Sequence, residues 1–86
     1  MFYTLRYFKK SNDGLSGSDF NNNEYAENIN LKYLLSFSQI LTFTLPFSGK
    51  SVGKYATVTM SNNDIYYITQ NSLLSLLNTL EELKKS

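Results

Sequence analysis

The stretch Leu31–Phe47, LKYLLSFSQILTFTLPF, alternates between apolar and polar residues over its length. Its odd-numbered residues are apolar or aromatic with the exception of Gln39, and its even-numbered residues are mostly polar or small. A period of two places alternate side chains on opposite faces of a β-strand. The stretch therefore predicts β-structure with one buried face, around which the rest of the chain has to pack.

Two arrangements of this stretch keep its apolar residues on one face. One straight strand would be about 56 Å long, which is too long for a chain of 86 residues. A hairpin with an odd-numbered loop, such as residues 37–39, would pair Leu35 with Leu41 and Tyr33 with Phe43. A bent continuous strand would preserve the alternation equally well. We favour the hairpin, and the bent strand stays open as the alternative.

The segments before this stretch predict one strand and one long loop. Residues 1–8 are rich in aromatic residues and predict a first strand. Residues 9–24 contain most of the turn-forming residues and predict a loop, which we expect Phe20 to pin to the core. Tyr25 and Ile29 are spaced i, i+4, which favours a short helical turn in residues 24–30.

A second hairpin follows a loop rich in glycine and lysine. Its turn signal is Asn62-Asn63, which lies between two β-prone segments. A tight two-residue turn there would pair Val58 with Tyr67 on the core face. Tyr55 and Tyr66 would then share the opposite, half-polar face, which suits solvent or a partner.

The end of the chain predicts a helix near residues 71–84. Its leucines follow a helical period: Leu73, Leu76, Leu77, Leu80 and Leu83. This stripe packs most simply on the sheet, and a homodimer seam is the alternative. The expected fold class is therefore α+β, in a single domain over residues 1–86. It has about five mostly antiparallel strands, near residues 2–8, 30–37, 40–47, 54–60 and 64–69, with the C-terminal helix packed on them.

The composition argues against most catalytic chemistry. The chain has neither cysteine nor histidine, the residues that form most zinc sites and that serve as the common nucleophile and base. Gly49-Lys50-Ser51 is not a phosphate loop, because Thr44 stands where that motif needs its first glycine. We therefore expect no enzyme activity, no cofactor and no metal.

The residues that we expect to bind a partner lie outside the predicted core. The first loop is acidic, the second loop carries lysines, and the last hairpin carries tyrosines. The formal net charge of +1 gives no long-range field that would select a partner. The candidate partner-binding residues are Tyr55, Tyr66, Lys50, Lys54, Asp13, Asp19, Phe20 and Glu24.

These features predict a small non-enzymatic protein-binding module. Heavy use of Asn, Lys, Tyr and Phe is typical of an AT-rich genome, which favours an accessory protein of a phage, plasmid or other mobile genetic element. Such a protein would inhibit a host enzyme or defence complex by steric block. Two alternatives stay open: a single-stranded nucleic-acid-binding module that uses a tyrosine-bearing sheet face, and a binder of a small anionic ligand. We expect a cytoplasmic location, without a signal peptide or a membrane span.

Overall fold

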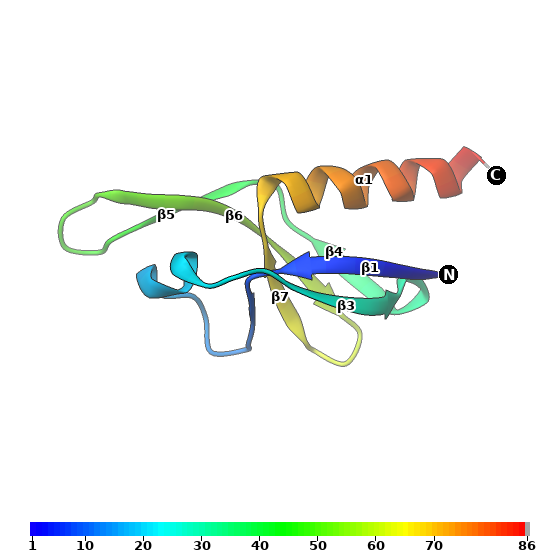
Figure 1. Ribbon diagram of the computed structural model, residues 1–86, viewed down its shortest axis with the longest axis horizontal. Helices are drawn as coiled ribbons and strands as arrows, with labels where there is room; N and C mark the ends of the chain where they lie inside the picture. Colours follow the sequence, from blue (N-terminus) through cyan, green and yellow to red (C-terminus); the bar gives the residue numbers. More distant parts are fainter. Residues whose placement is uncertain (86) are drawn as a thin grey trace.

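Two antiparallel β-sheets and one C-terminal helix form the protein in the computed structural model, which describes residues 1–85 (Figure 1). The helix is α1 (Gln70–Lys85), and two short 3-10 helices are η1 (Gly17–Asn21) and η2 (Leu31–Tyr33). The strands are β1 (Phe2–Tyr7), β2 (Lys9–Lys10), β3 (Tyr25–Asn30), β4 (Leu34–Phe37), β5 (Leu41–Thr44), β6 (Ser51–Met60) and β7 (Ile65–Ile68). The predicted α+β class, with antiparallel strands and a C-terminal helix packed on them, is confirmed.

The larger sheet is built on β6, which pairs with two strands along the same edge. Its strand order is β2-β7-β6-β4, and β5 pairs with the N-terminal part of β6. Phe37 lies opposite Val58 and Leu41 lies opposite Tyr55, so β4 and β5 run in the same direction. The predicted hairpin within residues 31–47 is therefore wrong, and the bent strand is the arrangement that the chain adopts.

Ser38 holds the bend between β4 and β5. Its N–H donates to the carbonyl oxygen of Thr57 at 2.9 Å, and its hydroxyl accepts from the Thr57 N–H at 2.9 Å. Alternation could not separate the two arrangements, because both keep the apolar residues on one face. The length of β6 decides between them, since its 10 residues give β4 and β5 a common partner.

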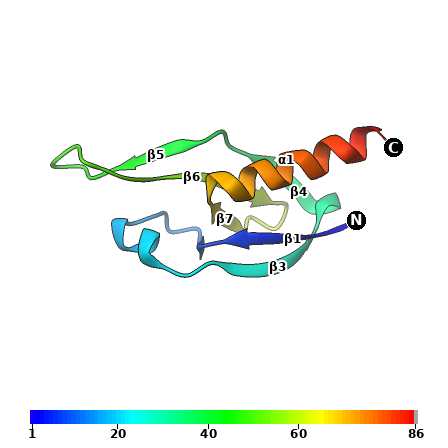
Figure 2. The same cartoon turned by 45° about the horizontal axis from the view of Figure 1, so that its top comes forward.

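The main hydrophobic core lies between the larger sheet, the β1–β3 pair and α1. In Figures 1 and 2, α1 lies above β1 on one side of the molecule. The buried side chains of this core come from both sheets and from the N-terminal half of α1: Leu5, Ile29, Ala56, Val58, Met60, Tyr66, Ile68, Leu73 and Leu76. The leucine stripe of α1 thus packs on the sheet as predicted, but mainly through its first two turns.

The hairpin between β6 and β7 is shifted by one residue from the predicted pairing. Its loop holds three residues, 61–63, and Asn63 adopts a left-handed conformation with a φ of 73°. Three-residue loops that end on a left-handed residue are common in hairpins. This loop places Tyr66 opposite Val58 and in the core, so the predicted position of Tyr66 on the half-polar face is wrong.

Residues 25–30 form β3, where a short helical turn was predicted within residues 24–30. β3 pairs with β1 along its whole length, with Glu27 opposite Leu5. One isolated helical turn is costly to nucleate, whereas β1 offers β3 a full ladder of backbone hydrogen bonds. The loop predicted over residues 9–24 contains β2 and η1, and the strand predicted near residues 30–37 begins only after η2.

Candidate functional site: a braced β-arm

A two-stranded arm projects from the end of the molecule where α1 begins. We define the arm as residues 41–55, which comprise β5, a tip loop and the first half of β6. Figures 1 and 2 both show it extending beyond the start of α1. The protein measures 47 × 23 × 21 Å, and its radius of gyration is 13.4 Å, against about 12 Å for a compact chain of this length.

The tip of the arm presents one aromatic side chain to solvent. Phe47 is 103% exposed, whereas most side chains of this size are at least half buried in a folded domain. The Leu45 N–H donates to the Lys50 carbonyl oxygen at 2.9 Å, and the Gly49 N–H donates to the Leu45 carbonyl oxygen at 2.9 Å. Gly49 has a φ of +68°, which glycine adopts without strain. The tip is therefore a hydrogen-bonded turn.

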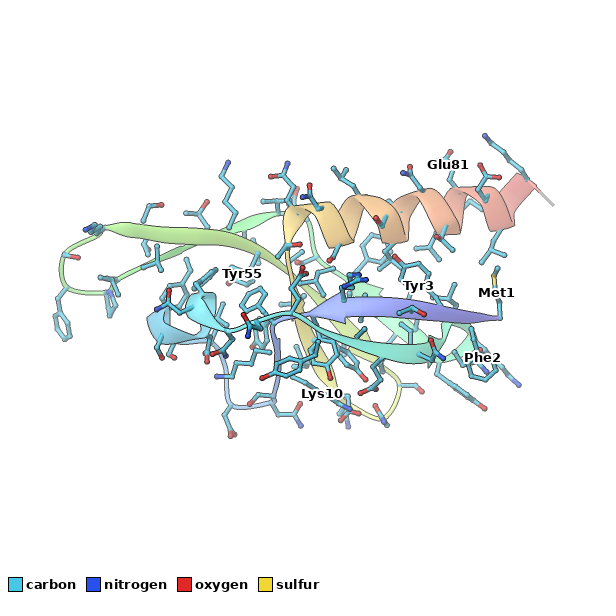
Figure 3. All side chains as sticks on the ribbon, viewed as in Figure 1. Met1, Phe2, Tyr3, Lys10, Tyr55 and Glu81 are labelled. Atoms are coloured by element: carbon cyan, nitrogen blue, oxygen red, sulfur yellow. The ribbon has the colours of Figure 1, made fainter. Side chains whose placement is uncertain are left out.

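The base of the arm is braced by Phe20 of η1. The Phe20 ring lies 5.2 Å from the Phe8 ring and 5.5 Å from the Phe43 ring, measured between centroids. It also lies over Gly53 of β6, where an added β-carbon would come within 2.7 Å of the ring. Tyr55 meets the same ring edge-on at 6.3 Å, and Figure 3 shows it on the side of β6 that faces η1. Phe20 thus pins its loop, but to this aromatic cluster and not to the main core as expected, and the loop in turn supports the arm.

A partly buried ion pair holds η1 in place against β2. Lys9 Nζ lies 2.7 Å from a carboxylate oxygen of Asp19. The same carboxylate accepts from the Ser16 N–H at 2.8 Å, which caps η1. The hydrogen bonds from Lys9 and Ser16 lower the pKa of Asp19 below its usual range. Asp19 is therefore a structural residue of the brace, and its carboxylate is already engaged within the chain.

The outer surface of the arm carries positive charge. Lys50 and Lys54 are both exposed, and neither takes part in a salt bridge within residues 1–85. The sequence has no acidic residue between Glu27 and Asp64. An aromatic tip on a cationic arm complements an apolar pocket with an acidic rim.

The other predicted site residues do not gather at the arm. Tyr66 is 2% exposed, and its hydroxyl donates to the Glu27 carboxylate. Asp13 lies in an exposed turn, where its N–H donates to the Ser11 hydroxyl at 2.9 Å. Glu24 accepts from the Ser72 hydroxyl at 3.4 Å beside the start of α1. The structure thus brings together Phe20, Asp19, Tyr55, Lys50 and Lys54 on or beside the arm, and it separates Tyr66, Asp13 and Glu24 from them.

The sequence prediction missed an apolar groove at the opposite end of the molecule. It has a volume of about 550 Å³ and lies between β4 and the C-terminal half of α1. Leu77 and Leu80 line it from the helix, and Leu34 and Phe37 line it from the strand. The length of the leucine stripe could have indicated this groove. A helix of four turns extends beyond the strands that cover its first half, so the leucines of its second half line a groove.

No protein-family model matches the chain, and no curated protein or solved structure matches it either. Within residues 1–85, no group of three or more acidic side chains is placed to hold a metal ion. None of the helices in this part of the chain is long and apolar enough to cross a membrane.

Proposed function

We propose that the protein is a non-enzymatic protein-binding module that inserts its arm into a cleft of a partner protein. The observation that carries this proposal is the fully exposed Phe47 at the tip of a projecting arm whose base is braced by Phe20. A chain gains nothing in its own stability from a phenylalanine that contacts only water. A buried aromatic anchor, in contrast, commonly dominates the energy of a protein interface.

The brace at the base supports a binding role for the tip. A hairpin held in one conformation before it binds loses less conformational entropy on binding than a flexible loop does. Phe20, packed against Phe43 and over Gly53, restricts the arm in this way. The arm therefore holds Phe47 in place before binding.

The charge of the arm defines the partner surface further. Lys50 flanks the tip and Lys54 lies along the same ribbon, without acidic residues nearby in the sequence. We infer a cleft with an apolar pocket for Phe47 and an acidic rim that raises the association rate. The arm would act by blocking this cleft, as expected for a cytoplasmic inhibitor of a host enzyme or defence complex encoded by a mobile element.

The nucleic-acid alternative was based on an exposed tyrosine face of the last hairpin, and these tyrosines are not available for stacking. Stacking of single-stranded bases needs exposed aromatic faces along a groove. Tyr66 and Tyr67 are buried, and Tyr55 packs against Phe20. The arm offers one aromatic side chain and two lysines, so nucleic acid is tested as an alternative outcome below.

The test places a photo-crosslinking amino acid, p-benzoylphenylalanine, at position 47 and, as a matched control, at position 74. Leu74 is also an exposed apolar residue, but it lies on α1 and not on the arm. We expect crosslinking from position 47 alone to one protein, identified by mass spectrometry. Binding of that purified protein should weaken at least 30-fold in Phe47→Ala, the usual effect of losing an interface anchor, and should stay unchanged in Leu74→Ala.

Two results would contradict the proposal. The first is equal affinity of the wild-type protein and Phe47→Ala for the purified partner. The second is salt-sensitive binding of a labelled single-stranded oligonucleotide that Phe47→Ala abolishes, which would identify the arm as a nucleic-acid-binding element instead.

A further inference from the structure

The larger sheet ends in an open edge at β4. Within residues 1–85, β4 pairs only with β6. The N–H groups of successive residues in a strand point to opposite sides. Because the Ser38 N–H points to β6, where it donates to Thr57, the N–H and carbonyl of Phe37 point outward from the edge. The Phe37 end of β4, which follows a register shift between Leu34 and Ser36, can therefore accept another strand.

This edge lacks the charges that usually protect open sheet edges. Natural proteins place lysine or other charged side chains on such edges to prevent pairing with another chain. Here residues 33–49 contain no charged residue at all. On β4 itself, Leu35 is 64% exposed and Phe37 is 43% exposed.

The apolar groove runs beside this open edge. Leu73 and Leu76 of α1 are buried by the sheet, whereas the groove exposes the next two turns of the helix. The groove is lined by Leu34, Phe37, Leu77, Leu80, Leu83, Glu81 and Lys84. An extended strand on the edge would thus lie next to an uncovered helix face, and both surfaces would be buried together.

We propose that the occupant of this surface is a second copy of the chain, in a two-fold symmetric dimer. A two-fold axis perpendicular to the sheet pairs β4 antiparallel with β4 of the partner copy and makes one continuous sheet. The same axis keeps both α1 helices on one face of that sheet, so the two grooves meet and close each other.

The charges of the groove favour a second copy over a foreign peptide. Glu81 and Lys84 are of opposite sign and lie one turn apart on the groove-lining part of α1. Figure 3 shows Glu81 on the half of α1 far from the arm. Two antiparallel copies of this helix place Glu81 of each opposite Lys84 of the other when the two-fold axis passes between residues 82 and 83. The groove is therefore complementary to itself, whereas a peptide would need a matching pair of charges of its own.

The dimer is independent of the proposed function, because antiparallel β4 strands direct the two arms away from each other.

The test measures the oligomeric state of the full chain by sedimentation equilibrium. We expect a dimer of twice the 9.9 kDa chain mass, with at least tenfold weaker association in Phe37→Lys. Leu74→Lys, the same change at an exposed leucine outside the groove, should leave association unchanged. Circular dichroism checks that each variant is folded.

Charge-reversal variants of Glu81 and Lys84 provide a second test of the dimer. Glu81→Lys and Lys84→Glu should each weaken the dimer about two- to fivefold, and the two changes combined should restore it. A wild-type protein that is monomeric at about 100 μM would overturn the dimer. So would a double variant that associates more weakly than either single variant. A monomer that still crosslinks to its partner through position 47 would overturn the dimer and leave the proposed function intact.

Discussion

Tyr66 places a hydroxyl against a carboxylate at the edge of the main core. The hydroxyl donates to Glu27 of β3, and Lys10 Nζ of β2 lies 5.0 Å from the centre of the Tyr66 ring. Burial, followed by the hydrogen bond to Glu27, raises the pKa of Tyr66 to about 12. The sequence could not predict this contact, because one residue more or less in the 61–63 loop exchanges Tyr66 with Tyr67 between the two faces.

Alkaline pH should therefore destabilise the protein through Tyr66. Its pKa is near 10 when unfolded and about 12 when folded, so the stabilisation is complete below pH 10 and is lost as the pH rises towards 12. The full loss amounts to roughly 2–3 kcal/mol. Tyr66→Phe lacks the hydroxyl and should be less stable by about 1–2 kcal/mol at pH 8. We expect this difference to shrink by pH 11 in urea denaturation curves.

A matched control for this titration is Tyr33→Phe. Tyr33 is exposed, so its replacement should change stability by only a small amount. Burial also raises the pKa values of Tyr3, Tyr7 and Tyr67, so some alkaline destabilisation should remain in Tyr66→Phe. A difference between the wild-type protein and Tyr66→Phe that stays constant from pH 8 to pH 11 would contradict the role of Tyr66.

The secondary-structure elements differ in how far a local pattern determines them. The helix was predicted near residues 71–84 and spans Gln70–Lys85, because its leucine period lies within one continuous segment. The bend after β4 and the strand β3 depend on their distant partners, β6 and β1, and no local pattern identifies those partners. For the same reason the sequence indicated Phe20 and the two lysines of the arm but not the arm itself.

The contact between η1 and the arm predicts that replacing Gly53 by alanine lowers the stability of the protein. Gly53→Ala would place a β-carbon 2.7 Å from the Phe20 ring, which has to shift out of its cluster. We expect a loss of about 1–3 kcal/mol of unfolding free energy, as for other overpacked sites. Gly17→Ala, in η1, would meet its nearest side chain at 3.6 Å and should cost less than about 0.5 kcal/mol.

A double-variant cycle separates this steric effect from a general intolerance of Gly53→Ala. In a Phe20→Ala background the ring is absent, so Gly53→Ala should cause no further loss of stability in urea denaturation. An equal loss in both backgrounds would show that the ring is not the reason for the glycine.

At the scale of the whole fold, the described residues 1–85 form two hydrophobic clusters on opposite faces of the larger sheet. One is the main core beneath α1 and the β1–β3 pair. The other is an aromatic cluster beneath η1, formed by Phe8, Phe20, Phe43, Tyr55 and Tyr67. β6 contributes alternate residues to both, so the alternation that marks its sequence reflects two partly separate clusters. The arm depends on the second one.

This division predicts that the arm can loosen while the main core stays folded. Phe20→Ala removes the centre of the aromatic cluster and none of the side chains of the main core. We expect amide hydrogen exchange to accelerate at least tenfold in residues 41–55, which corresponds to a local loss of about 1.4 kcal/mol. Amides of β7 and of the first two turns of α1 should exchange as in the wild-type protein. Equal acceleration in both regions would instead mean that the arm and the core unfold as one cooperative unit. Packing of Phe20 could then not change the stability of the arm independently of the rest of the fold.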